Sequence, residues 1–99
     1  MSLVNLPGGD LVVAGLHDLT LNRVTEEALL VSIAGPRLRR LGISVPELSG
    51  VPRPYEHALY GLLEDRMKIG AHGAYNALIQ KVVSFANAYE VVKKSNPGE

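Results

Sequence analysis

The sequence predicts an all-α fold, a small single-domain bundle of four main helices plus one short helix. Apolar side chains recur at three- and four-residue steps along most of the chain, which is the helical period. Gly and Pro residues stand where these stretches begin and end. We therefore expect residues 1–99 to form one helical domain, with frayed ends at 1–9 and 95–99.

The longest helix is predicted over residues 72–93, which contain the longest run without Gly or Pro. Its apolar side chains cover one broad arc of the helix. The polar side chains on the opposite arc are Asn76, Gln80, Ser84 and Asn87. Because such a broad apolar arc needs partners on more than one side, we expect the rest of the chain to wrap around this helix.

The first helix is predicted over residues 10–22. Asp10 follows a Pro-Gly-Gly turn and stands where an N-cap residue would stand. A strand over residues 11–14 is the alternative, since β-branched residues favour sheets. Later leucines extend the helical period, which favours the helix. Asn22 tolerates the left-handed conformation and is expected to end it.

The second helix is predicted over residues 25–35. Thr25 is a good N-cap residue, and two glutamates follow in the first turn. Gly35 is expected to end this helix and Pro36 to open the short helix over 36–41, because Pro is favoured at a first helical position and Gly past a last one.

Residues 42–54 form a proline-containing connection in which no long regular element fits. Residues 46–48 are predicted to form one helical turn. Apolar anchors along the connection are Ile43, Val45, Leu48 and Val51. A further helix is predicted over residues 54–68, with Gly70 ending it.

The hydrophobic core is predicted from the apolar arcs of these helices. It is expected to contain Leu16, Leu19, Leu30, Ile33, Leu38, Leu59, Leu63, Leu78, Val82 and Phe85.

Composition argues against several classes of function. Ten basic and ten acidic side chains cancel, so the chain has no global field for nucleic acid or an anionic membrane. The absence of Cys removes disulfides and thiolate chemistry. No phosphate-binding loop, dinucleotide fingerprint or paired metal ligands occur, so no cofactor and no metal are expected. These features favour a cytoplasmic protein without a membrane span.

The corner between the last two helices contains Gly70 and Gly73 as a Gly-x-x-Gly pattern. This pattern resembles the loop with which KH domains approach an RNA backbone. The chain departs from that family in three ways: no Lys or Arg lies between the glycines, Asn76 replaces an aliphatic residue, and three strands are not evident. The simpler interpretation is that both glycines relieve a tight corner.

Arg66 followed by His72 resembles the signature of HEPN-type ribonucleases, small all-α dimers in which such a pair meets at the subunit interface. The resemblance implies that His72 is an acid or base and that Arg66 holds the phosphate. The intervening Gly70 separates the two residues, whereas the family has them on one element.

The only dense charge cluster is formed by Arg37, Arg39 and Arg40. It could bind an anion or an acidic partner. Alternatively, it is the solvated side of a helix, whose guanidinium groups pair with Glu26, Glu27 or Glu47. The neutral chain favours the second interpretation.

Apolar positions outside the main arcs indicate a contact between protein chains. Val83 and Val91 fall off the main arc of the last helix, Ala88 flanks it, and Tyr60 is a weaker candidate. We therefore expect a homodimer. The predicted function is that of a non-enzymatic helical domain acting through protein contact or self-association. The alternative is RNA binding or HEPN-like cleavage through Arg66, His72 and the Gly70–Gly73 corner.

Overall fold

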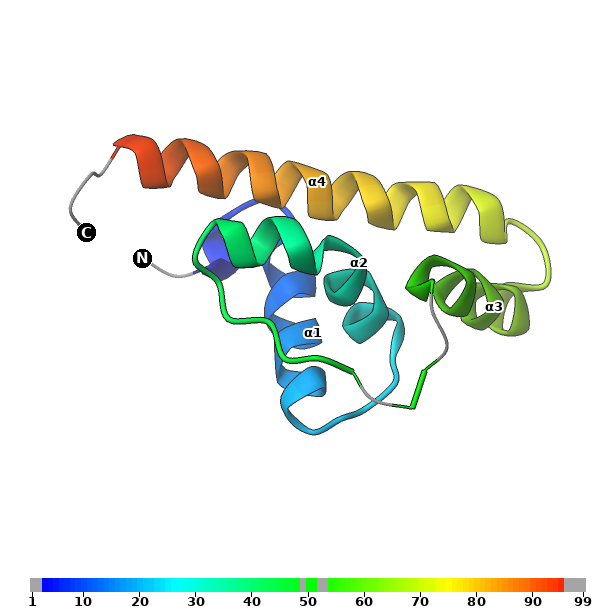
Figure 1. Cartoon of the computed structure of the whole chain (residues 1–99). Helices are drawn as coiled ribbons and strands as arrows, with labels where there is room; N and C mark the ends of the chain where they lie inside the picture. Colours follow the sequence, from blue (N-terminus) through cyan, green and yellow to red (C-terminus); the bar gives the residue numbers. More distant parts are fainter. Residues whose placement is uncertain (1–2, 49, 52–53, 96–99) are drawn as a thin grey trace.

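Helices form the whole regular structure in the described part of the chain, residues 3–48, 50–51 and 54–95 of a computed structural model. They are η1 (Leu3–Asn5, a 3-10 helix), α1 (Gly9–Thr20), α2 (Glu26–Arg40), α3 (Tyr55–Met67) and α4 (Ala71–Ser95). This confirms the all-α fold. α4 runs along one side of the molecule, and the other helices pack beneath it (Figure 1).

The turn between α1 and α2 forms as the sequence predicts. Asn22 adopts a positive φ of 52° after α1, and the Thr25 hydroxyl accepts a hydrogen bond from the Ala28 N–H at 3.0 Å. The same hydroxyl donates to Asp18 Oδ2 at 2.7 Å. Thr25 therefore both caps α2 and ties it to the end of α1.

The start of α1 differs from the prediction. Its N-cap residue is Gly8, with φ of 71° and no capping side chain, so Asp10 as the N-cap was wrong. Gly8 lies against α4, because a Cβ atom there would stand 2.5 Å from the Lys81 carbonyl oxygen. Ahead of it, η1 forms, and Leu3 and Leu6 pack partly buried against the core. These contacts belong to the described residues 3–9, part of the stretch 1–9 for which fraying stays a prediction.

α2 is a single helix that contains Pro36, so the predicted break between 25–35 and 36–41 was wrong. A proline inside a helix removes one backbone hydrogen bond, here the one to the Ser32 carbonyl. Val31 and Leu38, on either side of Pro36, are both fully buried. Continuing one helix keeps both side chains in the core, which offsets the lost hydrogen bond.

The connection between α2 and α3 is extended and anchored. Ile43, Val45 and Leu48 are buried, which confirms three of the predicted anchors. The helical turn expected at 46–48 is absent from these described residues. Side-chain hydrogen bonds hold the connection instead of a helical turn. The Nε and Nη2 atoms of Arg39 donate to the Val45 carbonyl oxygen at 3.2 and 2.9 Å. Pro52 and residues 96–99 lie outside the described residues.

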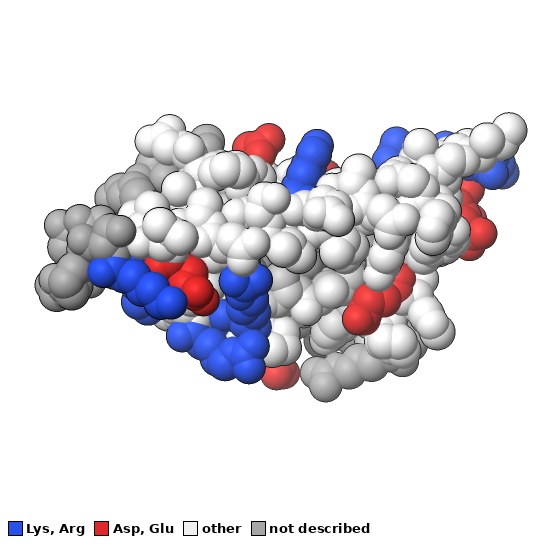
Figure 2. Space-filling view, turned by 90° about the horizontal axis from the view of Figure 1, so that it is seen from above, with Lys and Arg blue, Asp and Glu red and all other residues white. Residues whose placement is uncertain are grey.

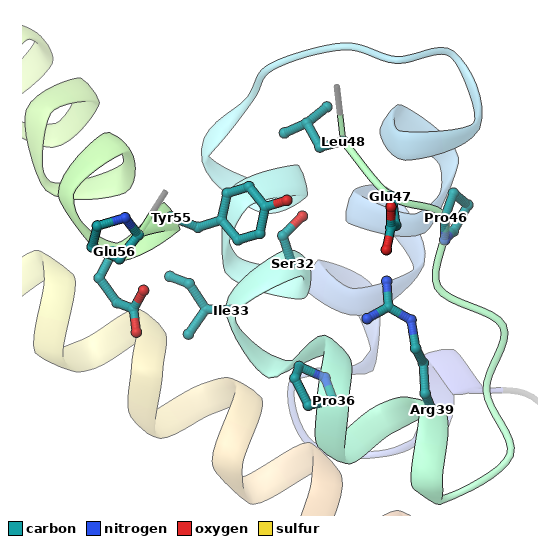
Figure 3. Close-up of a pocket in the computed structure, with 10 residues that line it drawn as sticks. Ser32, Ile33, Pro36, Arg39, Pro46, Glu47, Leu48, Tyr55 and Glu56 are labelled. Atoms are coloured by element: carbon teal, nitrogen blue, oxygen red, sulfur yellow. The ribbon is translucent and has the colours of Figure 1, made fainter. Parts of the chain in front are cut away.

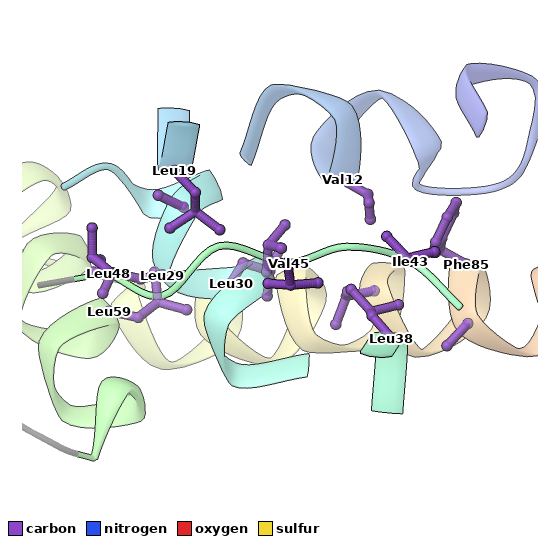
Figure 4. Packing of buried hydrophobic residues seen from close by; sticks show 14 of the residues in the cluster. Val12, Leu19, Leu29, Leu30, Leu38, Ile43, Val45, Leu48, Leu59 and Phe85 are labelled. Atoms are coloured by element: carbon purple, nitrogen blue, oxygen red, sulfur yellow. The ribbon is translucent and has the colours of Figure 1, made fainter. Parts of the chain in front are cut away.

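The core lies between the four α-helices and the connection (Figure 4). The correctly predicted buried residues are Leu19, Leu30, Leu38, Leu59, Leu63, Val82 and Phe85. Leu16, Ile33 and Leu78 are only partly buried and pack against the buried cluster. Buried residues missing from the prediction include Val12, Leu29, Val31 and Ala86.

Candidate functional site

Arg66, in the last turn of α3, is bonded to Glu26 in the first turn of α2. Its Nε lies 2.6 Å from Oε2 and its Nη2 lies 3.1 Å from Oε1, a two-pronged pairing of guanidinium with carboxylate. The hydrogen bond and the negative charge of Glu26 raise the pKa of Arg66. The guanidinium of Arg66, which the resemblance to ribonucleases would assign to phosphate binding, is therefore bonded to the carboxylate of Glu26.

His72 lies in the first turn of α4 and has different neighbours. Its Nε2 is 3.2 Å from the Asn76 amide nitrogen, and its ring centroid is 6.3 Å from that of Tyr60. Tyr60 is half-buried and also packs against Tyr75, with 5.6 Å between ring centroids. Arg66 and His72 are both described, and no hydrogen bond joins them.

The two glycines of the corner have different conformations. Gly70 has a φ of 86°, and its carbonyl oxygen accepts from the Ala74 N–H at 3.0 Å at the start of α4. Gly73 lies inside α4, with no atom within 4 Å of the place where a Cβ would stand. Only Gly70 therefore needs to be glycine for the fold.

The sequence did not indicate that the neighbouring Ile69 would be 87% exposed.

The three arginines of α2 do not act as one cluster. Arg37 Nη2 donates to Asn87 Oδ1 of α4 at 2.7 Å and lies 3.9 Å from Glu90 Oε1. Arg39 turns to the connection, as described above, and Arg40 is exposed at the end of the helix. The pairing predicted with Glu26, Glu27 or Glu47 is replaced by these contacts. Arg37 therefore fastens α4 to α2.

The side of α4 that faces away from the core carries no charged side chain of its own until Lys94, which is exposed near the end of the helix. It consists of six exposed residues at helical spacing, which we call the outer face: Gly73, Ala77, Gln80, Ser84, Asn87 and Val91. In Figure 2, which looks onto α4, an uncharged band runs along the molecule, with most Lys, Arg, Asp and Glu side chains toward its edges. The outer face therefore lacks the charged side chains that usually cover a solvated helix.

The predicted contact residues lie in different places relative to the outer face. Val91 belongs to it and is 63% exposed, and Val83 is 41% exposed and borders it. Ala88 is half-buried on the opposite border of the outer face. Tyr60 lies on α3 and packs against the rings of His72 and Tyr75. In the sequence, Gln80, Ser84 and Asn87 form the polar arc opposite the apolar one. Their regular spacing without any charge is the sequence signal for an uncharged exposed face.

Comparison with protein-family models, with curated proteins and with solved structures found no match to this chain. No helix among the described residues is both long and apolar enough to cross a bilayer. Within the same residues, His, Asp and Glu side chains form no group of three that could hold a metal ion.

Proposed function

We propose that the chain is a helical interaction domain that self-associates as a homodimer through the outer face of α4. The observation that carries the proposal is the uncharged, exposed character of all six residues of this face. Charged residues make up 20% of the sequence, yet none of these six residues is charged. The charged groups at this face are Arg37 of α2, which donates to Asn87, and Lys94 at the end of the helix.

Small side chains on the outer face suit close packing of two helices. Gly73, Ala77 and Ser84 project little from the helix, so a second helix can approach to the ordinary interaxial distance of about 8–10 Å. Val83 and Val91 add apolar area that water would otherwise cover. A two-fold axis brings the same face of each subunit together and buries both copies at once.

Charge substitution tests the choice of surface. Val83→Glu places a carboxylate at the border of the proposed contact, where burial without a partner is costly. Val24→Glu is the matched control, because Val24 is 50% exposed in the turn before α2, away from α4. Light scattering on a sizing column should report a monomer for Val83→Glu and a dimer for Val24→Glu. Two dimers would contradict the assignment of the face.

The ultraviolet absorbance ratio of the purified protein distinguishes this proposal from an RNA-directed role. The chain has no Trp and four Tyr residues, so bound nucleic acid would dominate its ultraviolet absorbance. We expect the purified dimer to show the absorbance ratio of protein alone. A ratio typical of nucleic acid that is lost on Arg66→Gln or His72→Gln would favour the RNA-directed alternative.

A further inference from the structure

A cavity opens on the side of α2 that carries Pro36, between the connection and the start of α3. Its volume is about 460 Å³, within the range of about 300–1,000 Å³ that small-molecule sites occupy. Its walls include Ser32, Ile33, Pro36, Arg39, Glu47 and Tyr55. Three different segments therefore contribute to one concave surface that is separate from the outer face of α4 (Figure 3).

Two opposite charges face this cavity without forming an ion pair. Figure 3 shows the guanidinium of Arg39 and the carboxylate of Glu47 turned toward one another. Both residues are described, and no hydrogen bond or ion pair joins them. Arg39 uses Nε–H and one Nη2–H on the Val45 carbonyl. Because a guanidinium has five N–H donors, three remain beyond these bonds, and Arg39 is held in place by the first two.

Apolar side chains line other parts of the cavity. Ile33 and Tyr55 lie on one side of the cavity and the ring of Pro36 forms its base (Figure 3). Glu56 also contributes to the lining, so the walls carry one positive and two negative side chains. This balance disfavours a simple anion and favours a ligand that carries a cationic group beside an anionic one.

We propose that this cavity binds a free aliphatic α-amino acid. The carboxylate of the amino acid accepts hydrogen bonds from Arg39, and its ammonium group donates to Glu47. The aliphatic side chain lies against Ile33 and Pro36, where it is removed from water. The proposal uses charges for which the described residues supply no ion-pair partner, and it is independent of self-association through α4.

L-leucine is the probe that tests this site, with backbone amide resonances as the readout. Saturable shifts are expected at the non-proline residues of 32–39 and 45–48. N-acetyl-leucine lacks the ammonium group and leucine methyl ester lacks the carboxylate, so neither should reproduce these shifts. Saturable binding of all three compounds would overturn the proposal, as would the absence of any saturable shift with L-leucine.

Two glutamate variants test whether the ammonium group of the ligand binds to Glu47. Glu47→Gln keeps the shape of an exposed side chain and removes its charge. Affinity for L-leucine should fall about tenfold, because the Gln oxygen still accepts a hydrogen bond but no longer attracts the ammonium group as an anion. Glu64→Gln is the matched control, because Glu64 is an exposed carboxylate on α3 outside the cavity, and affinity there should not change. Equal affinity in the two variants would overturn the assignment of Glu47.

Discussion

Gly15 of α1 lies directly against the backbone of Glu27 in α2. A Cβ atom at position 15 would stand 2.4 Å from the Glu27 carbonyl oxygen and 2.5 Å from a methyl group of Val31. The two helices can pack this closely only because position 15 carries no side chain. We predict that Gly15→Ala destabilises the protein by about 1–3 kcal/mol, the usual cost of overpacking, measured by urea denaturation.

Gly61→Ala is the matched control for that substitution. Gly61 lies inside α3, and no atom is within 4 Å of its Cβ position. Alanine there should leave stability unchanged or raise it by up to about 1 kcal/mol, because glycine is the poorer helix former. Equal effects of Gly15→Ala and Gly61→Ala would show that α1 and α2 do not pack as closely as described.

Phe85 is the only Phe in the chain, and its side chain is fully buried. Its ring stacks on Tyr89, with 5.9 Å between centroids and 22° between planes. Phe85→Ala should lower the free energy of unfolding by about 3–5 kcal/mol, because it removes apolar contacts and leaves a cavity. Thermal unfolding followed by circular dichroism checks this, and an unchanged melting temperature would contradict the burial of Phe85.

The raised pKa of Tyr75 predicts how the free energy of unfolding changes at high pH. Burial, and secondarily the negative charge of Glu56, raise the pKa of Tyr75 above its ordinary value of 10.0. The fold thus favours the neutral hydroxyl over the phenolate. Its contribution to stability is fully present below the ordinary pKa and is lost as pH rises through the folded-state value.

The variant Tyr75→Phe cannot ionise and should lose that part of the alkaline decline in stability. Urea denaturation at neutral pH and above pH 10, on native protein and variant, provides the comparison. The free energy of unfolding should therefore fall less for Tyr75→Phe than for the native protein as pH rises. A difference between the two proteins that stays constant would show that Tyr75 titrates like an exposed tyrosine.

The helical fold could be predicted because its signals are local. The capping by Thr25 and the positive φ of Asn22 depend on a few neighbouring residues. The continuity of α2 through Pro36 could not be predicted in this way. It depends on core contacts of Val31 and Leu38 with parts of the chain far away in sequence.

The candidate site shows the same division between local and distant information. Helical spacing places Val83 and Val91 on the exposed side of α4 from sequence alone. The pairing of Arg37 with Asn87 joins residues 50 positions apart, and that of Arg66 with Glu26 joins residues 40 apart. Because many acceptors lie at such separations, a sequence gives no basis for choosing among them.

Sedimentation equilibrium of the native protein, from micromolar to hundreds of micromolar, tests the central claim most directly. Self-association through the outer face of α4 predicts that the mass rises with concentration to twice that of the single chain and stays there, because a two-fold contact is closed. A single-chain mass across the whole range would contradict the homodimer and remove the main support for an interaction role.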